Sequence, residues 1–194
     1  MRQPLVERLA TVDGYFMNRA LSELRTIDWA TIGQDEVRRR SGVFGTSTAI
    51  PLRVHDTNRT DLTVLEYGEI VECRNTQNFN TLPALAILAG WAYQKVKGLH
   101  MGRIQCVRLE AGGDVGLHID PGTYFQVHDR LHIPLITDEG TIFFDDLGNE
   151  ARMPHGGLYR LNNRDLHGVR NESTNPRVHL IIDIQTKEHP WKSA

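Results

Sequence analysis

The chain has 194 residues, of which 40% are hydrophobic and 24% charged, a composition ordinary for one globular domain with its own core. Its net charge of −2 gives no broad basic surface, so the composition argues against nucleic acid as the main partner. No apolar run reaches the roughly 18 residues that a membrane span needs, and no signal peptide is evident, so we expect a cytoplasmic protein with no membrane partner. We expect Cys73 and Cys106 to be reduced thiols.

The first hundred residues predict two helical regions, a loop and one strand. Over residues 4–25, apolar side chains recur at spacings of three and four, which favours a helix that Asp13-Gly14 can divide. Residues 35–50 are basic and then rich in Gly, Ser and Thr, which predicts a loop. Residues 62–67 predict a strand. Residues 83–97 predict a helix, with proline at its first position and glycine just beyond its end.

From residue 101 onward, short β-forming runs alternate with turn residues. This spacing is typical of an antiparallel sandwich or barrel, and the segregated helices indicate an α+β protein that is mainly β. The predicted strands are 101–110, 115–120, 130–136, 141–144, 157–161, 166–170 and 177–185.

The segment GGDVGLHIDPGTYF raises the question of a metal site, because His118 and Asp120 stand two apart in a short apolar run. On a strand these side chains share one face, and together with a distant histidine they would form the two-histidine, one-carboxylate triad that binds Fe(II). His167, which is 47 residues after Asp120, is the best candidate for that histidine. The alternative is a core histidine beside a turn aspartate.

Two predicted strands carry arginines that could bind carboxylates near the candidate metal site. Arg177 begins the run RVHLIIDI ten residues after His167, and a buried arginine needs a partner such as a bound dicarboxylate. A salt bridge at a sheet edge is the alternative for Arg177. Arg130 and His132, which share a strand face, would hold a second carboxylate or tune the metal, unless they form an exposed strand start.

The order of five segments resembles the aspartyl/asparaginyl β-hydroxylase family of Fe(II)/2-oxoglutarate dioxygenases. The resemblance covers about residues 100–186, and it implies a double-stranded β-helix (jelly roll, cupin-like) over 101–186. Residues 1–100 carry no motif of this family, and from their own pattern we expect them to supply helical support and the first strands of a single domain 1–194. The five segments are HID, DRLHIPL, GTIFFDD, NRDLHGVRNES and RVHLIID.

The resemblance also implies the cofactors and the residues that hold them. The cofactors are Fe(II), the co-substrate 2-oxoglutarate and O2, and the reaction hydroxylates an unactivated C–H bond while releasing succinate and CO2. The presence of Asp120 argues against a halogenase, which needs that position vacant for halide. The implied iron ligands are His118, Asp120 and His167; Arg177 would anchor the C5 carboxylate of 2-oxoglutarate, and Arg130 and His132 would lie against its carboxylate near the metal.

The resemblance favours an amino acid as the substrate, either free or as an Asp/Asn-type residue of a peptide or protein. The alternative functions are a non-catalytic cupin-like metal or small-molecule binding protein and a metal-dependent isomerase. Asp145 could bind a substrate ammonium but more simply caps a turn, and His128 and His155 are interpreted first as loop residues. The weak candidates for substrate contact are His128, Asp145, His155 and His179.

Overall fold

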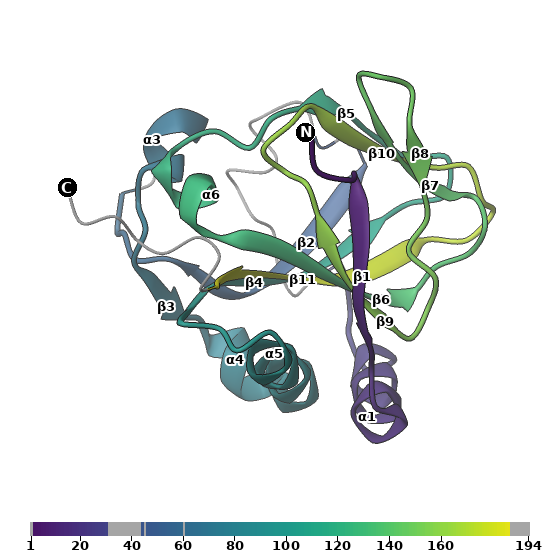
Figure 1. Ribbon diagram of the computed structural model, residues 1–194. Helices are drawn as coiled ribbons and strands as arrows, with labels where there is room; N and C mark the ends of the chain where they lie inside the picture. The colour runs from purple at the N-terminus through teal and green to yellow at the C-terminus, as the bar shows by residue number, and fades with distance from the viewer. Residues whose placement is uncertain (1, 31–43, 45, 60, 187–194) are drawn as a thin grey trace.

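The computed structural model describes residues 2–30, 44, 46–59 and 61–186, most of which form two antiparallel sheets (Figure 1). The strands are β1 (Val6–Thr11), β2 (Ser47–His55), β3 (Cys73–Asn75), β4 (His100–Leu109), β5 (Asp114–His118), β6 (Asp129–Ile136), β7 (Thr141–Asp145), β8 (Glu150–Ala151), β9 (Gly157–Leu161), β10 (His167–Asn171) and β11 (Arg177–Gln185). The larger sheet has the order β1-β9-β6-β11-β4-β2-β3, and the smaller has the order β5-β10-β7-β8.

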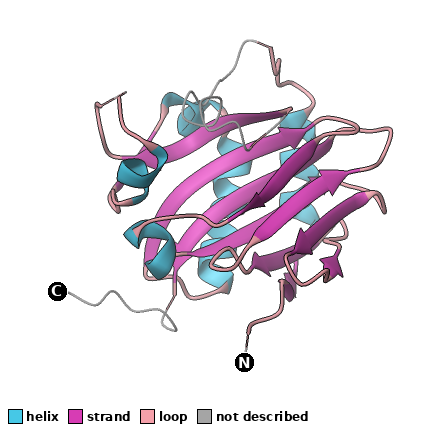
Figure 2. Cartoon of the chain, turned by 90° about the horizontal axis from the view of Figure 1, so that it is seen from above, coloured by secondary structure: helices cyan, strands magenta, loops and turns pink. Residues whose placement is uncertain are grey.

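The strands from β4 to β11 form a double-stranded β-helix. Along the chain β4, β6, β9 and β11 belong to the larger sheet, whereas β5, β7, β8 and β10 belong to the smaller one, and the strand pairs are antiparallel. The chain therefore winds back and forth between two facing layers, as a jelly roll does. All seven strands predicted between residues 101 and 185 are present, and the predicted fold class is confirmed (Figure 2).

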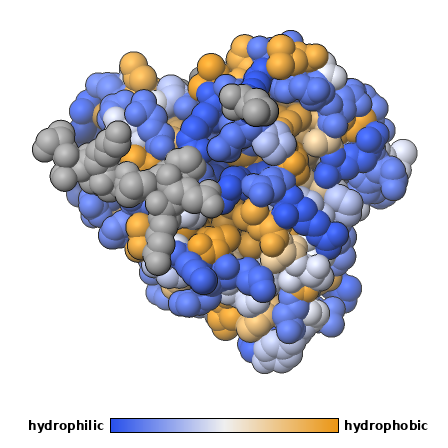
Figure 3. Space-filling view, viewed as in Figure 1, coloured by the Kyte–Doolittle hydropathy of each residue, from blue (hydrophilic) through white to orange (hydrophobic). Residues whose placement is uncertain are grey.

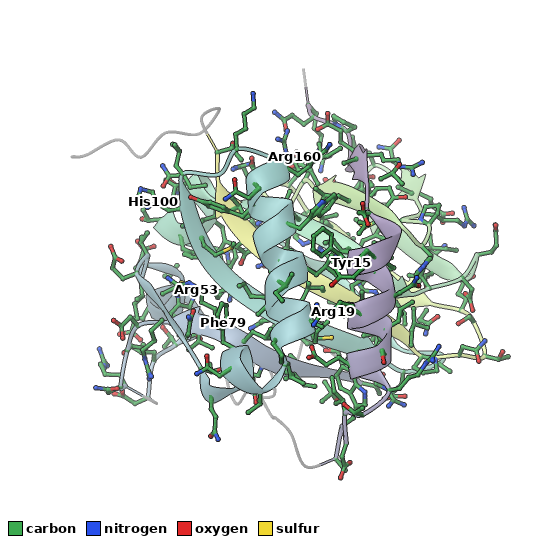
Figure 4. The ribbon with its side chains drawn as sticks, turned by 90° about the horizontal axis from the view of Figure 1, so that it is seen from below. Tyr15, Arg19, Arg53, Phe79, His100 and Arg160 are labelled. Atoms are coloured by element: carbon green, nitrogen blue, oxygen red, sulfur yellow. The ribbon has the colours of Figure 1, made fainter. Side chains whose placement is uncertain are left out.

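Two helices brace the larger sheet on its outer face. α1 and α5 lie side by side across this face (Figure 4). The Glu23 carboxylate near the end of α1 accepts backbone hydrogen bonds from Ala84 and Leu85, each at 2.9 Å, and so satisfies two N–H groups at the positive end of α5. The helices are α1 (Gly14–Leu24), α3 (Val64–Gly68), α4 (Gln77–Thr81), α5 (Pro83–Lys95) and α6 (Thr123–Val127).

The larger apolar core lies between these helices and the larger sheet. Leu131 and Ile133 of β6 and Leu180 and Ile182 of β11 belong to this core and are fully shielded from solvent. Each buried side chain of this size stabilises the fold by roughly 1.5–3 kcal/mol. Since side chains alternate along a strand, the opposite faces of β6 and β11 point between the two sheets. These inner faces carry arginine and histidine side chains, which form the site described below.

The helix predicted over residues 4–25 is correct only in its second half, which forms α1. Val6–Thr11 form β1, which pairs with β9 at the edge of the larger sheet. Leu5 packs between the sheets, whereas Val12 packs under the helices. The regularly spaced apolar residues therefore belong to two different cores and do not form one face of a single helix. The predicted break is confirmed, because Asp13 caps α1 by accepting a 2.8 Å hydrogen bond from the backbone N–H of Tyr15.

The strand predicted over residues 62–67 is wrong, because α3 occupies this segment. Thr63 and Glu66 form a capping box, in which each side chain bonds the backbone of the other, and this favours a helical start. Of the predicted loop 35–50, residues 35–43 and 45 lie outside the described residues, and residues 47–50 instead begin β2. The helix predicted over 83–97 is confirmed as α5.

Two further expectations concern the cysteines and membrane-spanning segments. Cys73 and Cys106 are both free thiols, as expected. Among the described residues, no helix has the length and apolar character to cross a membrane. The face in Figure 3 mixes hydrophilic side chains with separate apolar patches.

Candidate metal centre

His118, Asp120 and His167 converge at one end of the smaller sheet. His118 ends β5 and His167 begins β10, and the two histidines face each other in the register of this antiparallel pair. Asp120 lies two residues beyond β5 rather than on the strand, and its Oδ1 is 3.8 Å from His118 Nε2. One donor atom from each residue falls within 4.8 Å of the others. This is the facial arrangement of two nitrogens and one oxygen that suits Fe(II).

Backbone carbonyls orient both histidine rings. His118 Nδ1 lies 2.8 Å from the carbonyl oxygen of Gly116, and His167 Nδ1 lies 2.9 Å from that of Asp165. Because a carbonyl oxygen only accepts, each Nδ1 must carry the proton and donate it. The lone pair of each ring is therefore left on Nε2, which is the atom a metal would bind.

The carboxylate of Asp120 is also oriented by its neighbours. Its Oδ2 accepts hydrogen bonds from the Arg130 guanidinium and, at 3.1 Å, from the Asn163 side-chain amide. Both bonds engage the same oxygen, so Oδ1 is the oxygen left for a cation. The donor set thus fits a divalent metal in chemistry as well as in position.

Charge at the site favours the protonation states that bind metal. Burial acts to raise the pKa of Asp120, but Arg130, followed by His167 and His118, outweighs it, so this pKa is lowered. Burial lowers the pKa of His167. At neutral pH Asp120 is therefore ionised and His167 is neutral, as ligands must be.

A cavity between the two sheets joins the histidine pair to Arg177. It is lined by His118 and His167 at one side and by Arg177 and His132 of the larger sheet, with Phe143 of β7 among its apolar walls. The Arg177 guanidinium lies 5.3 Å from the centre of the Phe143 ring. A small molecule that touches His118 and His167 in this cavity would also lie near the buried guanidinium of Arg177.

Arg177 itself is 3% exposed and is oriented by two histidines. Its Nη2 donates to His179 Nδ1 at 2.9 Å and lies 3.5 Å from His132 Nδ1. Burial, reinforced by the positive charge of Arg177, lowers the pKa of both histidines well below the usual value. Both rings are thus neutral, and the only positive charge in this group is that of Arg177.

Arg130 is mostly shielded and paired, with its side chain 12% exposed, in contrast to the alternative of an exposed strand start. Its Nε and Nη2 donate to the two carboxylate oxygens of Asp183 at 3.0 and 3.2 Å, while its Nη1 bonds Asp120. Arg130 therefore bonds the candidate ligand Asp120 rather than pointing freely into the cavity, whose lining it shares.

The four weak candidates for substrate contact are absent from the described lining of this cavity. Asp145 caps a turn, accepting backbone hydrogen bonds from Leu147 and Asn149, as its simpler interpretation predicted. His155 occupies a turn. His128 is 2% exposed and stacks on Tyr124, so the interpretation as a solvated loop residue is wrong. His179 lies beside Arg177.

Sequence reasoning missed the residues that surround Arg130. Asn163 was visible only as one of two asparagines before His167, whereas Asp183 was a charged residue inside an apolar strand. Such a residue requires a partner, and this was the available signal. Arg103 and Tyr124 come from β4 and α6, whose approach to β11 no local pattern reveals.

Several solved structures share this fold. AviO1 from Streptomyces viridochromogenes Tue57 has a TM-score of 0.55 at 14% identity, covering 99% of this chain and 94% of that chain. The viral collagen prolyl hydroxylase of Paramecium Bursaria Chlorella virus-1 has a TM-score of 0.54 at 10% identity, covering 95% and 97%. A 2OG-Fe(II) oxygenase family oxidoreductase from Burkholderia pseudomallei has a TM-score of 0.50 at 14% identity, covering 91% and 93%.

The sequence comparisons identify the family. The chain has no significant match among curated proteins. The family profile of the aspartyl/asparaginyl beta-hydroxylases, however, matches residues 58–187, which is more than half of the chain and begins well before the resemblance at residue 100. This match includes both histidines and Arg177, which line one cavity, and Asp120, which lies beside the histidines. The chain therefore belongs to the aspartyl/asparaginyl β-hydroxylase family, a family of 2-oxoglutarate-dependent hydroxylases.

Proposed function

We propose that the chain is an Fe(II)- and 2-oxoglutarate-dependent hydroxylase that acts on an amino acid, either free or as an Asp/Asn-type residue of a peptide. The observation that carries this proposal is the single cavity lined by His118, His167 and Arg177. A metal site alone does not require a buried arginine across the same cavity, whereas 2-oxoglutarate has a distal carboxylate that this arginine would bind.

Each residue of the site would have a distinct task. His118, Asp120 and His167 would hold Fe(II), and the bound iron would supply the oxidising chemistry that turns O2, 2-oxoglutarate and a C–H bond into an alcohol, succinate and CO2. Arg177 would bind the distal carboxylate of 2-oxoglutarate through its planar guanidinium. The neutral states of His132 and His179 leave that carboxylate one strong cationic partner.

The cavity walls would restrict water and orient the co-substrate. Phe143 is 1% exposed and packs against both the Arg177 guanidinium and the His132 ring. An apolar surround strengthens the ion pair between Arg177 and a bound carboxylate, because the local dielectric constant falls. The amino-acid substrate class is supported by the family match, whose name describes aspartyl and asparaginyl side chains.

A substrate panel tests this proposal. The purified protein with Fe(II), 2-oxoglutarate and O2 would be offered the free amino acids and short peptides that contain Asp or Asn. Succinate formation and a mass gain of one oxygen in the same reaction are expected for at least one member, and neither for His167→Ala. A protein that binds a panel member without forming succinate or product would support the binding-protein alternative instead.

A further inference from the structure

Asp183 lies at the centre of a buried ion-pair cluster on the inner face of β11. It is 2% exposed, and it faces Arg130 directly across the β6–β11 pair. Arg103 of β4 donates to its Oδ2 from Nε at 3.1 Å, and the Tyr124 hydroxyl donates to the same oxygen at 3.2 Å. Burial acts to raise the pKa of Asp183, but Arg130 and Arg103 together outweigh it and lower this pKa, so the group is a carboxylate.

Arg130 connects this cluster to the metal centre. Two of its nitrogens, Nε and Nη2, bond the two oxygens of Asp183, and this fork fixes the plane of the guanidinium. The remaining Nη1 bonds Oδ2 of Asp120. A guanidinium held at one edge in this way presents its third nitrogen in one direction only.

Asp120 needs such a constraint because no strand holds it. It lies beyond the end of β5, where the backbone alone does not set the direction of the carboxylate. With Oδ2 bonded to Arg130 and Asn163, Oδ1 is the oxygen on the side of His118 and His167. The direction of this ligand atom thus depends on Arg130.

We propose that Asp183 is a positioning residue, which orients the metal ligand Asp120 through Arg130. The inference rests on the proposed function, because it assumes that Asp120 binds the metal. Gly102 supports the arrangement, since a Cβ at that position would overlap the Tyr124 hydroxyl that bonds Asp183. A side chain there would therefore push Tyr124 away from the carboxylate.

The test is metal binding by the metal-free protein, with Co(II) as the probe. Asp183→Asn should raise the Kd for Co(II) about tenfold and change the visible absorption spectrum of the bound Co(II), as expected when support for a ligand is lost. Asp129→Asn is the matched control. Asp129 is equally buried, and the bonds described for it lead to Arg160, Arg164 and Thr186 rather than to Asp120.

A merely structural role for Asp183 predicts a different result. In that case Asp183→Asn, like Asp129→Asn, would lower the melting temperature but leave the Kd and the Co(II) spectrum of the folded protein unchanged, and the inference would be overturned. If Asp183→Asn does not fold, the double variant Asp183→Asn/Arg103→Met takes its place in the same comparison with Asp129→Asn. This double variant removes one charge of each sign from the cluster.

The wild-type protein separates this inference from the proposed function. If wild type does not bind Co(II), or if His167→Ala binds it equally well, the proposed metal site itself fails. If wild type binds Co(II) through His167 but Asp183→Asn is indistinguishable from it, only the positioning role fails.

Discussion

Arg177→Met should abolish most 2-oxoglutarate binding while leaving the metal site intact. Methionine fills much of the same volume but removes the buried cation that lines the cavity. Removing one partner of a buried, hydrogen-bonded charge pair weakens binding by roughly 2–5 kcal/mol. The Kd for 2-oxoglutarate should therefore rise on the order of 30-fold to several thousand-fold.

The assay is the rise in melting temperature that 2-oxoglutarate causes in the Mn(II)-loaded protein. At a concentration of 100 times the wild-type Kd, bound ligand stabilises wild type by about 2.7 kcal/mol, and the weakened variant by less than about 1 kcal/mol. For a chain of this length the expected shift falls from roughly 5–10 °C to below about 4 °C. Each variant is compared with its own ligand-free melting temperature.

Arg108→Met is the matched control for this experiment. Arg108 lies on β4 opposite Val178, the residue after Arg177, but it pairs with Glu110 and stacks over Trp29 on the outer side of the sheet. Its replacement should preserve the wild-type shift. An Arg177→Met protein that still shows the full shift would refute the assignment of Arg177 as the carboxylate anchor.

Three other changes have defined outcomes. His167→Ala should raise the Kd for Fe(II) at least about 100-fold, which competition with a chelating dye would measure, because one of three ligands is lost. Glu23→Gln should lower the free energy of unfolding by about 1 kcal/mol and leave metal binding unchanged, since it weakens the cap of α5; urea unfolding and Co(II) titration check both parts. Acidification should destabilise the metal-free fold. Burial lowers the pKa of His55 to about 3 and those of His132 and His179 well below 6.5, so the unfolded chain binds protons that the folded one does not. The free energy of unfolding therefore reaches its full value above about pH 6.5. Below that pH it falls by about 1.4 kcal/mol for each pH unit and for each of these histidines. Equal urea midpoints at about pH 7.5 and 5.5 would contradict this prediction.

The β half of the fold could be predicted because its signals are local. Each strand from β4 to β11, apart from the two-residue β8, is a short β-forming run between turn residues. β1 could not be assigned in this way, because its pairing with β9 joins residues that are about 150 positions apart. The Thr63–Glu66 capping box was present in the sequence, however, and should have outweighed the β-forming side chains around it.

In the candidate site, the sequence could predict the residues with distinctive chemistry but not the partners that orient them. His118, Asp120, His167 and Arg177 carry chemistry that has few uses at these spacings. The fold brings the first three together and places Arg177 across a cavity from the two histidines. The partners of Arg130 were not predictable, because contact with Asp183 depends on the register between β6 and β11. Register is set by the packing of whole sheets rather than by any short segment.

The most direct test of the central claim is an anaerobic titration of the metal-free protein with Fe(II) and 2-oxoglutarate, followed by visible absorption. Chelation of Fe(II) by a 2-keto acid gives a charge-transfer band at roughly 500–530 nm. The wild-type protein should develop this band in proportion to one bound iron, and His167→Ala should not. A wild-type protein that binds both components without developing the band would contradict the assignment of this cavity as an Fe(II)/2-oxoglutarate centre.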